Sequence, residues 1–370
     1  MTTSYFIILH TNDIHGRVEG LSRIATIVER IRAENQDVPV LFFDLGDSED
    51  YSNRLSNLTK GAAMHRLLSA MGCDAAVVGN GAIPRYWPGV LKDHAAASRY
   101  PHLLANLRLA GGDFVPGTHP TALLDLGTMW LGLIGVTVEM PPYTRFFGLS
   151  TVPTLPLIRE LAAGLRSEGA DAVILLSHLG LAADRELAEE LQGDVALIIG
   201  GHSHDLLPEG EWVGDVLITQ AGHYAEHLGQ IDLSWDGEKL KATRATVLPV
   251  EDATPLSAQF LAEADAIEAE VERYLDEVIG ELVIPLDFVT DRECGVANLL
   301  ADALRQRMDA EVAVLVAGQA FSGPLPAGPL RRATLWDACP SPANPGVVAL
   351  VGSQLVELVT RGLDPERAAE

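Results

Sequence analysis

The chain has 370 residues, and 48% of them are hydrophobic, which suffices for two domains with sizeable cores. Its formal net charge of −25 argues against binding a nucleic-acid polymer, whose phosphate backbone needs clustered lysine and arginine. No apolar run approaches the length of a membrane span, so we expect no membrane partner.

Apolar runs of strand length alternate with helical periodicity over the first part of the chain, which is typical of a layered α/β sheet covered by helices. Helices are expected around residues 24–31, 64–71, 157–166 and 182–191. Residues 137–156 are rich in proline and aromatic side chains, and we interpret them as an irregular loop that could cover an active site. Strands are expected at residues 6–9, 40–43, 75–78, 101–107, 130–136, 173–176, 195–199, 216–220 and 229–235.

A long acidic helical stretch follows at residues 256–279, and the pattern then restarts. The second part is expected to contain helices at 296–308 and 354–361 and strands at 312–316 and 347–351. We therefore predict a first domain over residues 1–250, a linker helix over 251–280 and a C-terminal domain over 281–370.

Five apolar runs of the first domain are each followed by side chains that can bind metal. In an open α/β sheet, ligands bind beyond the carboxyl ends of the strands, so these side chains should meet at one edge. A single histidine after a strand is more often structural. Metal-binding side chains after each of five strands, however, rarely arise by chance. The mixture of imidazole nitrogen with carboxylate and amide oxygen fits Mn, Fe, Co or Zn better than Ca. The candidates are Asp13, His15, Asp47, Asn80, His178, His202 and His204, with Asp44 competing with Asp47.

These residues lie in short motifs whose order resembles the calcineurin-like metallophosphoesterases, and more narrowly the 5′-nucleotidase family. The resemblance implies a four-layer fold, in which helices enclose two packed sheets, followed by a shortened α/β C-terminal domain. The motifs are Asp13-Ile14-His15, Gly46-Asp47, Gly79-Asn80, Ser177-His178 and Gly201-His202-Ser203-His204.

The resemblance also implies two divalent metal ions (Mn, Zn, Fe or Co) and a metal-bridging hydroxide that attacks phosphorus. Metal 1 would be held by Asp13, His15, Asp47 and His204. Metal 2 would be held by Asp47, Asn80, His178 and His202, so that Asp47 bridges the two ions.

One motif departs from the family pattern, which usually reads Gly-Asn-His-Glu. Here Gly81 takes the place of the histidine and Pro84 that of its acidic helper, so no catalytic acid is assigned. General-acid help contributes about 10²–10⁴ in rate, so activity should fall without vanishing. A bacterial subgroup of the family similarly lacks this histidine.

The C-terminal part resembles the opening of the family's substrate domain but stops early. Residues 317–322 lack the asparagine and arginine that the family uses for nucleotide contacts, so we expect weak base recognition.

Several further side chains are candidates or alternatives. Arg85 and Arg145 are candidate phosphate clamps, and His223 and His227 follow a strand edge near the site. Asn80 is expected to contact substrate as well as metal. Solvated surface positions are the plainer interpretation of both arginines. Among the other histidines, His65 is expected on a helix face, and surface or loop positions are expected for His94, His102 and His119.

We predict a metal-dependent phosphoester hydrolase acting on nucleotides or other small phosphorylated metabolites. The alternatives are a nucleoside diphosphate sugar pyrophosphatase and a low-activity, metal-loaded protein that senses a phosphate ligand. The first strand begins at about Tyr5, which leaves no room for a secretory leader, so we expect a cytoplasmic protein. The sequence makes no prediction of the oligomeric state.

Overall fold

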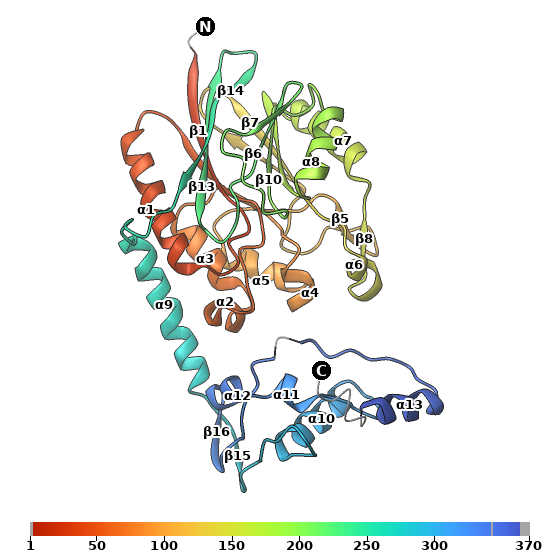
Figure 1. Ribbon diagram of the computed structural model, residues 1–370. Coiled ribbons are helices and arrows are strands. Elements are labelled where there is room, and N and C mark those ends of the chain that lie inside the picture. Colours follow the sequence, from red (N-terminus) through yellow and green to blue (C-terminus); the bar gives the residue numbers. More distant parts are fainter. Residues whose placement is uncertain (1–2, 342, 363–370) are drawn as a thin grey trace. The chain divides into compact units, whose positions relative to one another are not determined.

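The computed structural model describes residues 3–341 and 343–362. It divides into two compact units, Met1–Glu272 and Arg273–Glu370, which are described separately here (Figure 1).

The first unit contains two sheets of six strands each. The first sheet has the order β14-β13-β1-β2-β3-β4, in which β1 to β4 run parallel and β13 and β14 join antiparallel. Its strands are β1 (Ser4–Thr11), β2 (Val40–Asp44), β3 (Ala75–Val77), β4 (His102–Leu103), β13 (His227–Trp235) and β14 (Leu240–Pro249).

The second sheet has the order β11-β12-β10-β9-β7-β6, with four parallel central strands and an antiparallel strand at each edge. Its strands are β6 (Thr121–Asp125), β7 (Trp130–Thr137), β9 (Ala172–His178), β10 (Leu197–Gly200), β11 (Glu211–Val213) and β12 (Val216–Thr219).

Strand alternation divides the apolar side chains between two cores, because successive side chains point to opposite faces of a strand. Leu131 and Leu133 of β7 pack between the sheets with Phe6 and Ile8 of β1. Residues Ile134 and Val136 point the other way, under the helices of the second sheet.

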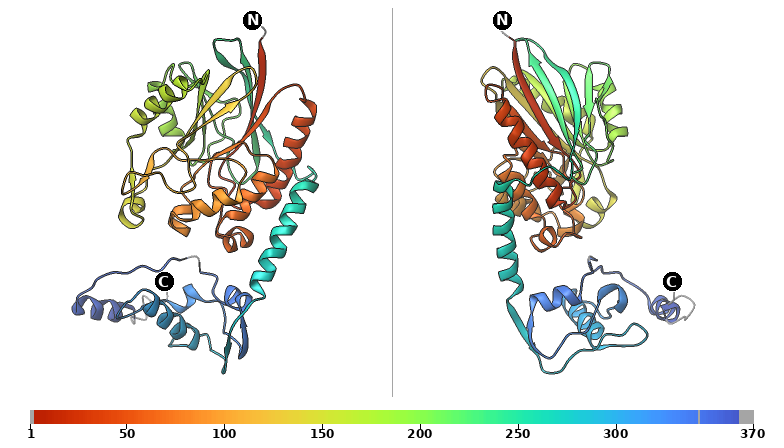
Figure 2. Two further views of the ribbon diagram at one scale, coloured as in Figure 1. Left: turned by 180° about the vertical axis from the view of Figure 1, so that it is seen from behind. Right: turned by 60° about the vertical axis from the view of Figure 1, so that its left-hand side comes forward.

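Helices cover the outer face of each sheet (Figure 2). The first sheet is covered by α1 (Val18–Glu34), α3 (Ala62–Ala70) and α5 (Val90–Ala97), and the second by α7 (Thr154–Ser167) and α8 (Leu181–Glu190). The predicted four-layer arrangement is confirmed. Shorter helices α2 (Arg54–Leu58) and α4 (Ala82–Tyr86) lie in the loops of the first sheet.

The prediction of an irregular loop at residues 137–156 is wrong. This segment contains α6 (Pro141–Phe146) and β8 (Leu149–Thr151), and β8 pairs with β5 (Leu107–Leu109). The segment is ordered because Tyr143 and Leu149 are buried in a small apolar cluster of their own. Proline at the first turn of α6 suits a helix start, where the missing N–H has no intrahelical partner.

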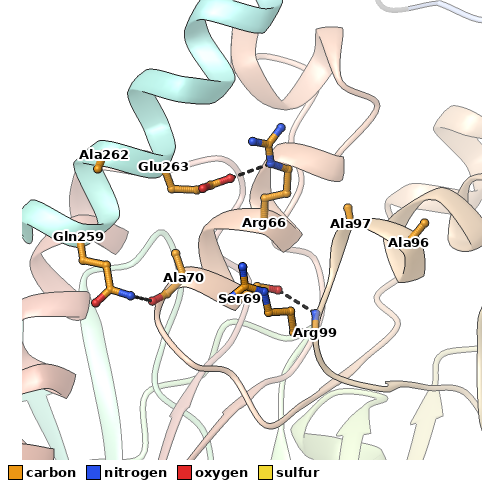
Figure 3. A pocket seen from close by; sticks show the side chains of 9 residues that line it. All are labelled: Arg66, Ser69, Ala70, Ala96, Ala97, Arg99, Gln259, Ala262 and Glu263. Carbon is orange, nitrogen blue, oxygen red and sulfur yellow. Dashed lines mark hydrogen bonds and ion pairs between the residues drawn. The ribbon is translucent and has the colours of Figure 1, made fainter.

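The long acidic stretch forms α9 (Ala258–Leu275), whose first turns lie against α3. Gln259 donates a hydrogen bond to the Ala70 carbonyl at 3.0 Å, and the Arg66 guanidinium donates to Glu263 at 2.7 Å (Figure 3). Arg54 of α2 pairs with Glu268 and Glu272, farther along the helix. Polar contacts therefore attach α9 to the first unit, and each of these half-exposed pairs contributes only modestly to stability.

The second unit is smaller. It contains the antiparallel pair β15 (Val278–Leu282) and β16 (Gly328–Arg331) with α10 (Gly295–Arg307), α11 (Ala317–Ala320), α12 (Arg332–Ala338) and α13 (Gly352–Gly362). Its core is a cluster around Val296, Phe321 and Leu325. The strands expected at 312–316 and 347–351 are absent from these described residues, and Val314 and Val348 are 62% and 74% exposed. A strand needs a backbone partner, and neither segment pairs with one.

Across residues 3–341 and 343–362, the structure contains no helix that combines the length and apolarity needed to cross a membrane.

Candidate metal centre

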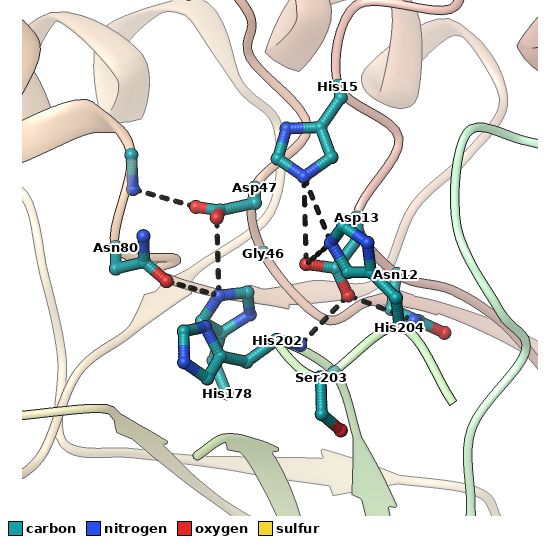
Figure 4. Close-up of polar contacts among 12 residues, drawn as sticks. Asn12, Asp13, His15, Gly46, Asp47, Asn80, His178, His202, Ser203 and His204 are labelled. Atoms are coloured by element: carbon teal, nitrogen blue, oxygen red, sulfur yellow. Dashed lines mark hydrogen bonds and ion pairs between the residues drawn. The ribbon is translucent and has the colours of Figure 1, made fainter. Parts of the chain in front are cut away.

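The loops that follow β1, β2, β3 and β10, together with the last residue of β9, bring the predicted ligands together at one edge of the two sheets (Figure 4). Most of these ligands sit on an unusual backbone. Left-handed φ angles occur at Asp13 (52°), His15 (48°), Asp47 (51°), His202 (75°) and His204 (61°). Non-glycine residues rarely adopt this conformation, and where they do it commonly marks a functional site.

Backbone contacts hold the loops against one another. The amide of Asp13 donates to the Gly46 carbonyl at 3.0 Å, and the amide of His15 donates to the Asp47 carbonyl at 2.9 Å. Gly79 lies so close to the second loop that a Cβ atom there would stand 2.1 Å from Asp47 Oδ1. Only glycine fits at this position, because a real side chain would force Asp47 out of place.

The first group of candidate ligands consists of Asp13, His15 and His204. The Nε2 atoms of the two histidines are 3.3 Å apart, and His204 Nε2 is 3.4 Å from Asp13 Oδ1. Asp13 Oδ1 is buried without a hydrogen-bond partner, whereas Oδ2 accepts from the His202 amide at 2.8 Å. A buried carboxylate oxygen left free beside two imidazoles fits a cation, because an unpaired buried oxygen is otherwise costly.

The second group surrounds His178, which is buried at the end of β9. His178 Nδ1 lies 2.6 Å from the Leu45 carbonyl, which only accepts, so Nδ1 carries a proton and the lone pair at Nε2 faces outward whenever the ring is neutral. That Nε2 atom is 3.5 Å from Asp47 Oδ2 and 3.2 Å from Asn80 Oδ1. A histidine that donates through one nitrogen and presents the other to oxygen ligands is the usual arrangement around a bound metal.

In the absence of metal, the charged side chains of the centre shift one another's pKa values. Burial alone would lower the pKa of His178, but the Asp47 carboxylate outweighs it and raises that pKa to about 9. Burial likewise tends to raise the pKa of Asp47, and the neighbouring His178 outweighs it and lowers that pKa. The centre therefore holds a proton where a cation fits, and metal binding would displace it.

The donor set fits two divalent ions. Asp13 belongs to both compact groups, the one with His15 and His204 and the one with Asp47 and His178. By geometry Asp13 lies between the groups, whereas the resemblance gives the bridging role to Asp47. The ring of His202 lies 5.2 Å from that of His178, next to the second group.

Comparison with known proteins decides the family. The sequence profile described as Calcineurin-like phosphoesterase matches residues 6–206, and that of the 5′-nucleotidase C-terminal domain matches residues 278–369. The chain is 30% identical over 358 residues to the uncharacterized metallophosphoesterase YunD of Bacillus subtilis, covering 95% of this chain and 76% of that protein. The chain belongs to the calcineurin-like phosphoesterase family.

Further relatives carry the name 5′-nucleotidase. The 5′-nucleotidase of Diplobatis ommata is 28% identical over 345 residues, which are 81% of this chain and 59% of that protein. The crystal structure of a 5′-nucleotidase precursor from Thermus thermophilus superposes with a TM-score of 0.61 at 22% identity, covering 91% of this chain and 74% of that one. The chain thus spans less than two thirds of the Diplobatis protein, and the Thermus structure supports the fold alone. Calcineurin-like phosphoesterases are hydrolases with a dinuclear divalent metal centre, and this chain is a hydrolase of that family.

Within the phosphoesterase site, the competing carboxylate Asp44 is occupied elsewhere. Its oxygens accept hydrogen bonds from Thr11 Oγ1 at 2.9 Å and Ser48 Oγ at 2.6 Å. Asp44 therefore fastens the turn after β2, and Asp47 is the carboxylate of that loop which faces the centre.

The other residues predicted to contact substrate do not all lie beside the candidate metal ligands. His223 comes to the phosphoesterase site, because its ring stacks on that of His204 at 4.7 Å. Arg85 lies on α4, just after Gly81, with its guanidinium over Tyr51 and Tyr86. Arg145 is exposed on α6 over the ring of Phe146.

Three residues at or near the centre are absent from the predicted site. Asn12 donates to Asp13 Oδ2 at 3.0 Å and thereby orients that carboxylate. Tyr224 lies edge-on to His15 at 5.6 Å, and Arg17 stacks on Tyr224 at 4.6 Å. Arg17 directly follows the first metal motif and its glycine, which is the signal that could have selected it.

We predict that Asp47→Ala lowers the metal content by about two ions per chain, because Asp47 faces one group and, by resemblance, bridges both. Metal would be counted by elemental mass spectrometry after reloading and desalting. Asp50→Ala is the matched control, since Asp50 lies on the same loop and accepts from the Ser52 amide, outside both groups. An Asp47→Ala protein with the full metal content would contradict this assignment.

A second prediction concerns Asp184, which is buried beneath β9 and accepts a hydrogen bond from Ser177 Oγ. Burial raises the pKa of Asp184 to about 7, from an ordinary value of 3.8. The folded protein therefore holds a proton that the unfolded chain releases. Stability from this group is present below about pH 4 and is lost as the pH rises to about 7.

We expect Asp184→Asn to melt several degrees above the wild type at about pH 8 and level with it at about pH 4, because asparagine is never charged and still accepts from Ser177. Melting temperatures of the metal-free proteins at the two pH values provide the test. An equal difference at both pH values would show that the carboxyl does not titrate in this range.

Proposed function

We propose that this protein hydrolyses phosphoester bonds in nucleotides or other small phosphorylated metabolites. The observation that supports the proposal is the convergence of the predicted ligands, five of them on left-handed backbone, at one sheet edge. Divalent ions bound there would supply an activated oxygen nucleophile and neutralise the phosphoryl oxygens.

The protein's own groups have distinct tasks in this proposal. Asp13 and Asp47 supply the negative charge that offsets the cations, and Asp13 is held in place by Asn12 and the His202 amide. The imidazole of His178 is fixed by the Leu45 carbonyl, so its Nε2 atom needs no reorientation when metal replaces the proton. Fixed ligands of this kind favour catalysis because little reorganisation accompanies the reaction.

The weak point of the site is protonation of the leaving group. Gly81 contributes only its backbone amide, which donates to Asp47 Oδ1 at 2.8 Å. No side chain is present there to give a proton to a departing oxygen. We infer that the enzyme prefers leaving groups that carry negative charge well, such as aryl oxides and phosphates, over nucleoside alkoxides.

That same observation favours a second candidate, a pyrophosphatase of nucleoside diphosphate sugars. A pyrophosphate linkage releases a phosphate monoester, which leaves without a general acid more readily than a 5′-alkoxide does. Phosphate-ligand sensing with negligible turnover is the outcome expected if no substrate class is cleaved. A cytoplasmic location stays a prediction.

The test compares hydrolysis of an aryl phosphate, a nucleoside diphosphate sugar and AMP at saturating metal. We expect the wild type to cleave the first two faster, and Gly81→His to raise the AMP rate by about tenfold or more, because a placed acid contributes ~10²–10⁴. Gly81 has an ordinary φ of −74°, and an added Cβ would lie 3.2 Å from Asp47 Oδ1, so a side chain requires only a small adjustment.

Gly81→Ala is the matched control, since it adds the Cβ without an acid. Equal gains from alanine and histidine would contradict the leaving-group explanation. A wild type that cleaves AMP as fast as the aryl ester would show that another group supplies the proton. His223, which stacks on His204, would then be the first residue to replace.

We also predict weak selectivity among nucleobases. Residues 317–322 offer neither a guanidinium nor an asparagine amide for base or ribose contacts, and Gln319 is their longest polar side chain. Rates for AMP, GMP, UMP and ribose 5-phosphate should therefore agree within about tenfold, because one lost hydrogen-bonding contact is worth roughly 1–2 kcal/mol. A preference of several hundredfold for one base would contradict this.

A further inference from the structure

A second cluster of imidazoles lies in the first unit, outside the motifs of the phosphoesterase site. It joins Glu49 of the loop after β2, His65 of α3 and His94 of α5. His65 is 5% exposed and His94 1%, and the Glu49 side chain is 9% exposed. The prediction of a surface or loop position is wrong for His94 on α5 and for His102 on β4, because both are buried. Helices α3 and α5 lie side by side there (Figure 1).

The orientation of His94 leaves a lone pair facing a carboxylate. Its Nε2 atom is 2.7 Å from the carbonyl of Lys60, which only accepts, so Nε2 carries the proton of the neutral ring. Its Nδ1 atom is buried without a hydrogen-bond partner and lies 3.4 Å from Glu49 Oε1. Two acceptors that face each other in a buried place repel unless a cation lies between them.

The distances favour a metal ion over a charge-assisted hydrogen bond. A charge-assisted N–H···O bond to a carboxylate is about 2.7–2.9 Å long. The nitrogens of His65 and His94 instead lie 3.3 Å and 3.4 Å from the same oxygen, Glu49 Oε1. Two ligands on a tetrahedral ion with bonds of about 2.0–2.1 Å lie roughly 3.3–3.4 Å apart, as these do.

The groups behind the ligands match those of a metal site. His94 donates to a backbone carbonyl through its far nitrogen, and His65 Nδ1 is 3.0 Å from Tyr100 Oη. In metal sites the far nitrogen of a ligating histidine is held in this way, which fixes the ring and its tautomer. His178 of the dinuclear centre has the same arrangement, with its far nitrogen on the Leu45 carbonyl.

The backbone makes room for the cluster at one point. Gly61 has a φ of +88°, and a Cβ added there would lie 2.5 Å from Glu49 Cγ and 2.8 Å from His94 Nε2. Its neighbour Lys60, whose carbonyl holds His94, is itself left-handed at φ 52°. The turn between α2 and α3 is thus shaped around the carboxylate and the imidazole.

We propose that Glu49, His65 and His94 form a third divalent-metal site, suited to zinc, in addition to the dinuclear centre. Two imidazoles and one carboxylate are a known zinc donor set, with a water molecule in the fourth position. The ion would tie α3 and α5 to the loop that carries Asp47, so its role is structural support of that loop.

The test counts zinc in reloaded, desalted protein. About three ions per chain are expected for the wild type, about two for His94→Ala and for Glu49→Gln, and about one for Asp47→Ala. Glu49→Gln keeps the shape of the side chain and guards against misfolding of the alanine variant, which circular dichroism would reveal. His102→Asn is the matched control: this buried ring lies 4.6 Å from that of His65, but its Nε2 faces Ser98 Oγ, and its zinc content should equal that of the wild type.

Cobalt gives a second readout on the Asp47→Ala background. One four-coordinate Co²⁺ should produce intense visible absorption that disappears when Glu49→Gln is added, and zinc should raise the melting temperature only while Glu49 is present. If zinc content and melting temperature are the same in folded wild type, His94→Ala and Glu49→Gln, the site does not exist and the cluster is a hydrogen-bonded one. If the Glu49 and His94 variants lose zinc but Asp47→Ala keeps the wild-type zinc content, the third site is upheld and the dinuclear centre is overturned.

Discussion

The site depends on the close approach of the backbone loops that end the parallel strands. Gly79 contacts Asp47 so tightly that no side chain fits between them, and Gly46 turns with a φ of 89° directly before that aspartate. Left-handed backbone at a non-glycine residue costs of order 1–3 kcal/mol, and such residues recur in this centre. A bound cation would offset that cost, because it is attracted by the same carboxylates that the loops force together.

Local pattern was sufficient to predict sheets covered by helices and the side-chain types after the strands, whereas the four layers followed from the family resemblance. Apolar runs of strand length and the stripe of Ile24, Val28 and Ile31 on α1 need no tertiary information. The segment at 137–156 differs, since its order comes from burying Tyr143 and Leu149 in a cluster that local periodicity does not contain. Residues 312–316 show the converse case, in which a β-branched run has strand propensity but no partner.

The convergence of the candidate ligands at one sheet edge followed from sequence, but the orientation of their side chains did not. That His178 turns Nε2 outward depends on the Leu45 carbonyl, 133 residues away in the chain. Asp13 has only one oxygen free for a metal, because the side chain of Asn12 and the amide of His202 both donate hydrogen bonds to the other. Such second contacts are set by the packing of distant loops, and they decide which lone pairs are available to a metal. The buried positions of His94 and His102 escaped prediction, although His94 lies on the same buried face of α5 as Val90 and Leu91.

The loop after β2 shows how position within a fold assigns different tasks to one residue type. Asp44, Asp47 and Glu49 lie within six residues of one another, and all three are largely enclosed by protein. Burial raises the pKa of Asp44 to about 6. The Asp44 carboxyl group accepts hydrogen bonds from the hydroxyl groups of Thr11 and Ser48 and thereby stabilises the turn. Burial also tends to raise the pKa of Asp47, but the neighbouring His178 outweighs it, lowers that pKa and keeps the carboxylate charged. Asp47 thus faces the centre as a charged group, whereas both oxygens of Asp44 already accept hydrogen bonds from Thr11, Ser48 and the Gly46 amide. Because Glu49 continues the same loop into the histidine cluster, any ion bound there would restrain the backbone on which Asp47 stands.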